Sequence, residues 1–128
     1  MADLIRERVE ATRDVVPRLR HRIQRFVAEC CSDDTHLLET VGLAVTEACG
    51  NVVMHAYPRG EVGWIEMVAE HVDGTVTITV LDEGVGLKTE ALSEGLGLGL
   101  TLIRRVAQAE IRARPLGGTE VRMVIPCR

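Results

Sequence analysis

The chain has 128 residues and a mass of 14.0 kDa, the size of one domain with one hydrophobic core. Its apolar and charged fractions, 46% and 27%, are those of a folded soluble protein. A net charge of −4 and only three aromatic residues argue against direct nucleic-acid binding, which needs basic and stacking side chains. No apolar run approaches the roughly 18 residues of a membrane span, and the amino terminus lacks the apolar core of a signal peptide, so we expect a cytoplasmic protein without membrane contact.

The four cysteines show no metal-binding pattern. They are Cys30, Cys31, Cys49 and Cys127, with no Cys-x-x-Cys pair and no ordered histidine spacing around them. In a reducing compartment we therefore expect free thiols and no zinc site.

The first half of the chain is patterned mainly for helices. Residues 4–11 alternate weakly and fit either an edge strand or the start of a helix. Residues 13–30 predict a helix, and Asp33 or Asp34 is the expected N-cap of a second helix over about 35–55. The apolar stripe of this second helix consists of Leu37, Val41, Ala44, Ala48 and Val52.

The period changes to two after the second helix. Residues 64–72 and 75–82 each alternate between apolar and polar side chains. Asp73-Gly74 between them is a strong hairpin turn signal. These segments predict two antiparallel strands.

The last third of the chain combines a glycine-rich segment, a helix and a hairpin. Glycines concentrate in residues 83–99, a helix is expected over about 98–109, and the final hairpin pairs 110–114 with 119–125. Early helices and late, hairpin-joined strands indicate the α+β class. We therefore expect residues 1–128 to form a single domain, a two-layer sandwich whose mixed, mostly antiparallel sheet carries the helices on one face.

Three clusters of residues are candidates for one site, and the first is on the second helix. Glu47 and Asn51 project about 40° apart on one flank of its apolar stripe. The amide oxygen suits a hard cation such as Mg²⁺, and the carboxylate can take a proton from an attacking hydroxyl. A solvated helix flank is the alternative interpretation of this pair.

The second cluster follows the strand over 75–82. Asp82 shares the parity of the apolar side chains of that strand, so its carboxylate points toward the helices, where it is costly unless satisfied. It can accept the exocyclic amine of adenine and would reject the carbonyl of guanine, while Gly84 and Gly86 let the backbone approach the base. A local turn is the alternative. Thr119 begins the last strand on the same face, and an ordinary threonine at a strand entry is the alternative interpretation.

The third cluster is a run of alternating glycine and leucine that opens a helix. Gly95, Gly97 and Gly99 present successive backbone amides at a helix N-terminus, which favours an anion. Leu100 can anchor this turn from inside. The run lacks the Gly-Lys-Ser/Thr ending of a Walker loop and the preceding strand of a dinucleotide fingerprint.

The three clusters in this order resemble the ATP-binding domain of the GHKL (Bergerat-fold) superfamily, whose histidine-kinase-like ATPase fold is α+β. Within it, the segments TEACGNVVMHAYP and GLGLGLTLIRRVA are most similar to the small anti-sigma-factor serine kinases. The resemblance spans about residues 4–126. It implies a protein serine/threonine kinase that uses ATP and Mg²⁺, phosphorylates a STAS-type anti-sigma-factor antagonist and sequesters a sigma factor.

The resemblance also implies roles for single residues. Asn51 would hold Mg²⁺ against the phosphates, and Glu47 would be the base for the serine hydroxyl. Asp82 would bind adenine beside Gly84 and Gly86, Thr119 would support the base edge, and the glycines of the third cluster would cradle the phosphates. His55 matches a histidine that often follows the asparagine. Its helical angle places it in the apolar stripe, so we expect it to pack.

Two further hypotheses remain open at this stage. In the family that the chain resembles, the segment between the second and third clusters is a lid over the nucleotide. Here only eight residues, 87–94, separate Gly86 from Gly95, so this lid is short. A nucleotide-dependent binding module with little kinase activity is therefore the alternative. Arg18, Arg22 and Arg25 along one side of the first helix are its candidate docking face, and a solvated helix face is the other interpretation of these arginines. A pure interaction domain with vestigial motifs is the third hypothesis. The threonine face of the sheet is a candidate surface for a homodimer.

Overall fold

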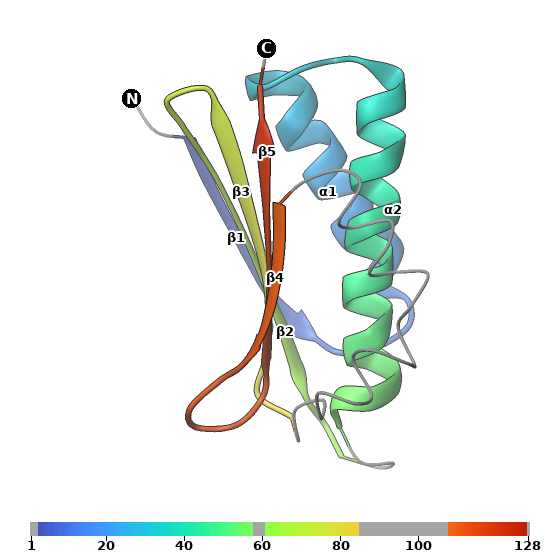
Figure 1. Cartoon of the computed structure of the whole chain (residues 1–128). Helices are drawn as coiled ribbons and strands as arrows, with labels where there is room; N and C mark the ends of the chain where they lie inside the picture. Colours follow the sequence, from blue (N-terminus) through green and yellow to red (C-terminus); the bar gives the residue numbers. More distant parts are fainter. Residues whose placement is uncertain (1–2, 58–60, 85–107, 128) are drawn as a thin grey trace.

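A five-stranded sheet with two helices on one face makes up the computed structural model, which describes residues 3–57, 61–84 and 108–127 (Figure 1). The strand order is β1-β2-β3-β5-β4, and every neighbouring pair is antiparallel. The expected α+β sandwich is confirmed, and its described strands are antiparallel throughout. The elements in chain order are β1 (Asp3–Glu10), α1 (Val15–Cys30), α2 (Thr35–Asn51), the π-helical turn η1 (Val52–Ala56), β2 (Trp64–Val72), β3 (Thr75–Asp82), β4 (Gln108–Ala113) and β5 (Thr119–Pro126).

The first segment, for which strand and helix were both open, is the edge strand β1. It pairs with β2 along its whole length, from Asp3 opposite His71 to Glu10 opposite Trp64. Ile5 and the other half-buried residues of β1 face the helices, and the residues between them are exposed. The weak alternation in the sequence is therefore that of a strand with only one covered face.

The second helix begins where the sequence predicts, whereas the first begins at Val15, two residues after its predicted start. Asp34 caps α2, since its Oδ1 accepts the backbone N–H of Leu37 at 2.9 Å. The inner face of α1 buries Leu19, Ile23, Phe26 and Val27. The predicted stripe of α2 also lies in the core, with Leu37 half-buried at its start.

The predicted helix over 35–55 changes its winding after Asn51. Val52–Ala56 form a π-helical turn, and each i→i+5 turn holds one residue more than an α-helical turn. The extra residue shifts the direction of the side chains, so His55 is exposed. The expectation that His55 packs in the apolar stripe is therefore wrong.

The core lies between the inner face of the sheet and the two helices. The buried apolar side chains of the sheet are Ile65, Met67, Ala69, Val76, Ile78, Val80, Met123 and Ile125. The helical segment Thr35–Ala56 has 22 residues and is apolar enough, by length and composition alone, to cross a membrane. This differs from the expectation that no apolar run approaches the length of a membrane span. In the fold, Val41 and Ala48 of this segment pack in the core, as in the central helix of a globular domain.

The end of the predicted third helix is wrong. Gln108 and Ala109 were expected to be its last residues, but they begin β4, opposite Val124 and Met123 of β5. Ala109 packs against the core from this position. Pairing with β5 therefore determines the conformation here, whereas the helical pattern of the preceding residues does not extend this far. The expected helix over 98–107 lies outside the described residues.

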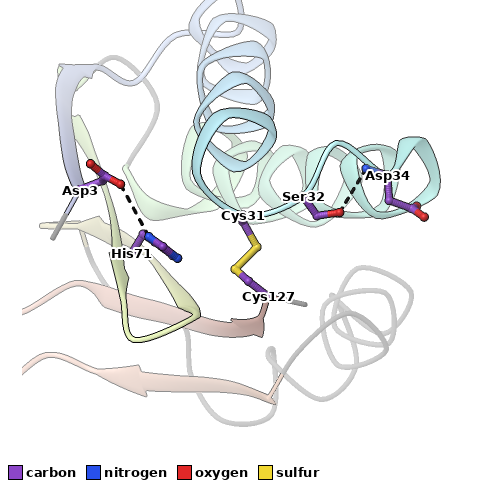
Figure 2. Close-up of a disulfide and its surroundings, with 6 residues drawn as sticks. All are labelled: Asp3, Cys31, Ser32, Asp34, His71 and Cys127. Carbon is purple, nitrogen blue, oxygen red and sulfur yellow. Dashed lines mark hydrogen bonds and ion pairs between the residues drawn. A yellow bond between two sulfur atoms is a disulfide. The ribbon is translucent and has the colours of Figure 1, made fainter. Parts of the chain in front are cut away.

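The expectation of four free thiols is also wrong. Cys31, directly after α1, forms a disulfide with Cys127, directly after β5 (Figure 2). The two residues are 96 positions apart, and their Cα atoms are 5.1 Å apart. Cys30 and Cys49 remain free, and Cys49 is buried, which raises the pKa of its thiol to about 12. The disulfide ties the end of α1 to the end of the sheet at which β5 finishes.

Candidate functional site

Asp82 is a buried carboxylate at the end of β3. It is 4% exposed and faces the helices, as its parity predicts. Its Oδ1 accepts the backbone N–H of Gly84 at 3.0 Å and that of Thr119 at 3.2 Å. Because both donors meet the same oxygen, they hold Oδ1 at the end of β3 and next to the start of β5. Thr119 is 5% exposed at the start of β5, so the prediction that it faces the helices is confirmed.

The cost of burying the negative charge of Asp82 is only partly offset by its surroundings. Burial raises the pKa of its carboxyl, while the two backbone N–H groups and the charge of Arg114 oppose this rise. Arg114 also donates from Nη1 to the backbone oxygen of Asp82 at 2.7 Å. A buried carboxylate that the fold does not fully stabilise is typical of a ligand-binding group.

Gly84 brings the loop after β3 against the end of the π-helical turn. A Cβ at Gly84 would lie 1.9 Å from the backbone oxygen of Ala56, so only glycine fits there. Asn51 lies five residues before Ala56, directly before the π-helical turn. The close contact therefore places the Asp82–Gly84 segment next to the helical segment that carries Asn51.

Tyr57 is a positioning residue that is absent from the predicted site. Its hydroxyl donates to the backbone oxygen of Trp64 at 2.5 Å and accepts the backbone N–H of Glu83 at 3.1 Å. It thereby ties the start of β2 to the residue that follows Asp82. The Tyr-Pro pair after the second helix is typical of a helix end, and nothing in the sequence indicates these two hydrogen bonds. An open pocket of about 370 Å³ lies here, lined by Tyr57, Glu61, Val62, Gly63, Trp64, Glu83 and Gly84.

Gly118 is a second positioning residue that we did not identify. Its φ is +97°, a conformation that favours glycine, and a Cβ would lie 2.0 Å from the backbone oxygen of Asp82. The turn before β5 therefore closes directly on the end of β3. The Gly-Gly pair in the sequence predicts the turn, but not what it contacts.

Glu47 and Asn51 lie one turn apart near the end of α2, on the helix flank that the sequence predicts. Glu47 is exposed, and Asn51, the last residue of α2, is half-buried. An amide oxygen and a carboxylate are hard oxygen ligands of the kind that Mg²⁺ prefers. The donor types at this end of α2 therefore fit a magnesium ion, with Asn51 as the residue that would hold it.

Half of the predicted site lies outside the described residues. This holds for Gly86, Gly95, Gly97, Gly99 and Leu100, so the phosphate cradle remains a prediction. Of the other site residues, hydrogen bonds bring together Asp82, Gly84 and Thr119.

The predicted docking face on α1 borders a groove. Arg18, Arg22 and Arg25 line a groove of about 300 Å³ between α1 and β1. Arg22 donates from Nε to Glu7 of β1 at 3.1 Å, so this arginine has a partner within the groove. The other two arginines are exposed and give the groove a positive charge.

The chain is similar to known proteins in sequence and in fold. The family model for the histidine kinase-like ATPase domain matches residues 9–125. The anti-sigma F factor of Heyndrickxia coagulans is 32% identical, with 81% of this chain and 79% of that relative covered. The anti-sigma F factor of Caldanaerobacter subterraneus subsp. tengcongensis is 34% identical; the match covers 62% of this chain and just 64% of that relative. The mycobacterial sensor histidine kinase MprB shares the fold, with a TM-score of 0.58, 22% identity, and 97% and 99% of the two chains covered.

Proposed function

The chain belongs to the family of histidine kinase-like ATPase domains, and on this premise we propose that it is an ATP-dependent serine protein kinase that acts as an anti-sigma factor. It would phosphorylate a serine of a STAS-type anti-sigma-factor antagonist and sequester a sigma factor. The relatives named anti-sigma F factor support the anti-sigma role. A sigma-factor partner implies a location in the cytoplasm.

The observation that carries the proposal is the environment of Asp82. The carboxylate is buried, its Oδ1 is held by two backbone N–H groups, and burial raises its pKa in spite of them. In this proposal Asp82 accepts the 6-amino group of adenine. Guanine presents a carbonyl at that position, and a carboxylate repels it, so the same group selects ATP over GTP.

The end of α2 supplies the groups that act on the phosphates and on the substrate. Asn51 would hold Mg²⁺, which neutralises phosphate charge when it is bound. Glu47 is exposed one turn earlier, so a serine of a docked protein can reach it. As the serine Oγ bonds to the γ-phosphorus, its proton passes to the Glu47 carboxylate, and the bond to the β-phosphate oxygen breaks to release ADP.

Two surfaces are candidates for protein partners. The groove between α1 and β1 carries Arg18 and Arg25, which would complement acidic groups of the antagonist or the sigma factor. The outer face of the sheet carries the threonines of β3 at alternate positions and is the surface that we propose for a homodimer.

The kinase proposal is tested by phosphoryl transfer from radiolabelled ATP to a STAS-type antagonist. The variant Glu47→Gln keeps the size of the side chain and removes the base, so transfer should fall by roughly 10²- to 10⁴-fold while ATP binding is unchanged. Glu39→Gln is the matched control, because Glu39 is also exposed on α2. Equal labelling by Glu47→Gln and wild type would exclude Glu47 as the base. Antagonist binding that depends on nucleotide without any labelling would favour the binding-module alternative.

A further inference from the structure

Three metal-ligating side chains meet at the end of the sheet opposite to Asp82. Asp3 opens β1, His71 lies near the end of β2, and Cys30 is the last residue of α1. One ligand atom from each lies within 4.8 Å of the other two. The three residues are far apart in the sequence, so the topology alone brings them together.

The pairing of β1 with β2 holds two of these ligands in place. Asp3 and His71 are direct cross-strand partners, and both share the parity of the residues that face the helices. Nδ1 of His71 lies 3.6 Å from Oδ2 of Asp3 (Figure 2). The end of α1 adds the thiol of Cys30 from the helix layer, so sheet and helix together form one cluster.

The spacing of the cluster fits a tetrahedral ion. Metal–ligand distances of about 2.0–2.2 Å to nitrogen and oxygen and about 2.3 Å to sulfur place the nitrogen and oxygen about 3.4 Å apart, and sulfur about 3.6 Å from either. The observed 3.6 Å between His71 and Asp3 and the limit of 4.8 Å for all three need only small side-chain rotations to reach these values.

We propose that Asp3, Cys30 and His71 form a binding site for Zn²⁺. The thiol of Cys30 gives up its proton to solvent as its sulfur binds the ion, and the thiolate and the Asp3 carboxylate together balance the two positive charges. A thiolate with an imidazole favours Zn²⁺ over Mg²⁺ or Ca²⁺, which take oxygen ligands. Three protein ligands leave the fourth position for a water molecule.

The surroundings of the cluster restrict its movement. The disulfide between Cys31 and Cys127 anchors the residue next to Cys30 to the end of β5 (Figure 2). The backbone N–H of Cys127 donates to the oxygen of Gly74 in the turn after β2, at 2.7 Å. Both ties preorganise the ligands. Cys30 and His71 are half-buried and Asp3 is exposed, so an ion can enter from solvent.

The zinc site is separate from the nucleotide site. Asp82 lies opposite Ile65 in the sheet, and His71 lies six residues further along β2, about 20 Å away. An ion at this distance stabilises the contact between the end of α1 and the sheet. The inference therefore does not depend on the kinase proposal.

The test is a titration of the full-length chain, with its disulfide intact, with Zn²⁺ and with Co²⁺ as a spectroscopic probe. We expect one ion per chain, a higher melting temperature, and a thiolate-to-cobalt charge-transfer band that Cys30→Ser abolishes. His71→Ala and Asp3→Asn should each weaken binding by at least the roughly 10- to 100-fold that loss of an outer-shell partner causes. His21→Ala, an exposed histidine of α1, is the matched control and should bind as wild type.

Two outcomes would overturn the proposal. Stoichiometric binding that survives in Cys30→Ser and His71→Ala places the ion elsewhere. Failure of the wild type to bind either ion leaves Asp3 and His71 as a simple ion pair. Melting curves of each variant with a chelator present show whether it is folded, and Asp3→Asn, which changes an exposed side chain, keeps the test decisive if Cys30→Ser unfolds.

Discussion

Replacing Asp82 by asparagine tests whether this carboxylate distinguishes adenine from guanine in the proposed site. The side chain keeps its size, but only one of its two polar atoms can still accept a hydrogen bond. Because Oδ1 of Asp82 accepts the N–H groups of both Gly84 and Thr119, at 3.0 and 3.2 Å, the amide oxygen of the variant must take that place. The amide nitrogen then takes the position of Oδ2 and presents donors to the base.

The expected effect on binding follows from this forced orientation. The variant loses a hydrogen bond to a charged acceptor, which contributes about 1.5–3 kcal/mol. In addition, the NH₂ group of the asparagine faces the amino group of adenine, and neither group can accept a hydrogen bond from the other. ATP should therefore bind about 10- to 150-fold more weakly, since 1.4 kcal/mol corresponds to a factor of ten. The carbonyl of guanine can accept from the new amide, so the preference for ATP over GTP should fall or reverse.

Calorimetric titration with ATP and GTP measures both effects. The control is Asp73→Asn, which removes the same charge from an exposed turn residue with φ +51°, a conformation that asparagine tolerates. It should bind both nucleotides as the wild type does. If Asp82→Asn binds ATP with wild-type affinity and unchanged preference over GTP, the carboxylate does not read the base, and the main support for the kinase proposal is lost.

Two predictions concern stability without nucleotide. Burial raises the pKa of Asp82 above its ordinary 3.8, so the folded state binds this proton more tightly than the unfolded state. The wild type must therefore lose stability as pH rises from 3.8 through the raised pKa. Denaturation measured across this pH range should show that Asp82→Asn gains stability relative to the wild type. No gain would refute burial as the cause of the raised pKa. Gly84→Ala must move the backbone of Ala56 and should cost about 1–3 kcal/mol. In contrast, Gly50→Ala meets nothing within 4 Å and should gain about 0.5–1 kcal/mol, so equal effects of the two substitutions would contradict the contact.

The sequence predicts the strands and the inward direction of Asp82 and Thr119 because side chains alternate strictly along a strand. One buried position in β3 then determines the direction of every other. The same argument fails in the second helix. A single π-helical turn changes the phase after Asn51, and the pattern of apolar residues does not reveal it, so the direction of His55 was predicted wrongly. The direction of a side chain in a helix depends on the number of residues per turn, so it is harder to predict than the direction of a side chain in a strand.

Contacts between distant parts of the chain were the other source of error. Cys31 and Cys127 are 96 residues apart, and nothing near either one indicates its partner. The cluster of Asp3, Cys30 and His71 also has no local spacing, because a strand start, a helix end and a hairpin each supply one ligand. Spacing rules identify ligand sets that lie within one turn or loop, and here the order of the strands brings the residues together.

The two ends of the sheet therefore have opposite effects on stability. The end with Asp82 combines a buried carboxylate, a π-helical turn and two glycine contacts that no side chain can replace, which are the departures from ideal local structure expected at a functional site. At the other end, a disulfide closes a loop of 96 residues, which contributes about 2–5 kcal/mol, and the proposed zinc ligands lie beside it. Strands β2 and β3 run through both ends and share one core. Stabilisation at the end of the sheet with the disulfide can thus offset the loss of folding stability at the end with Asp82, without altering the geometry around Asp82.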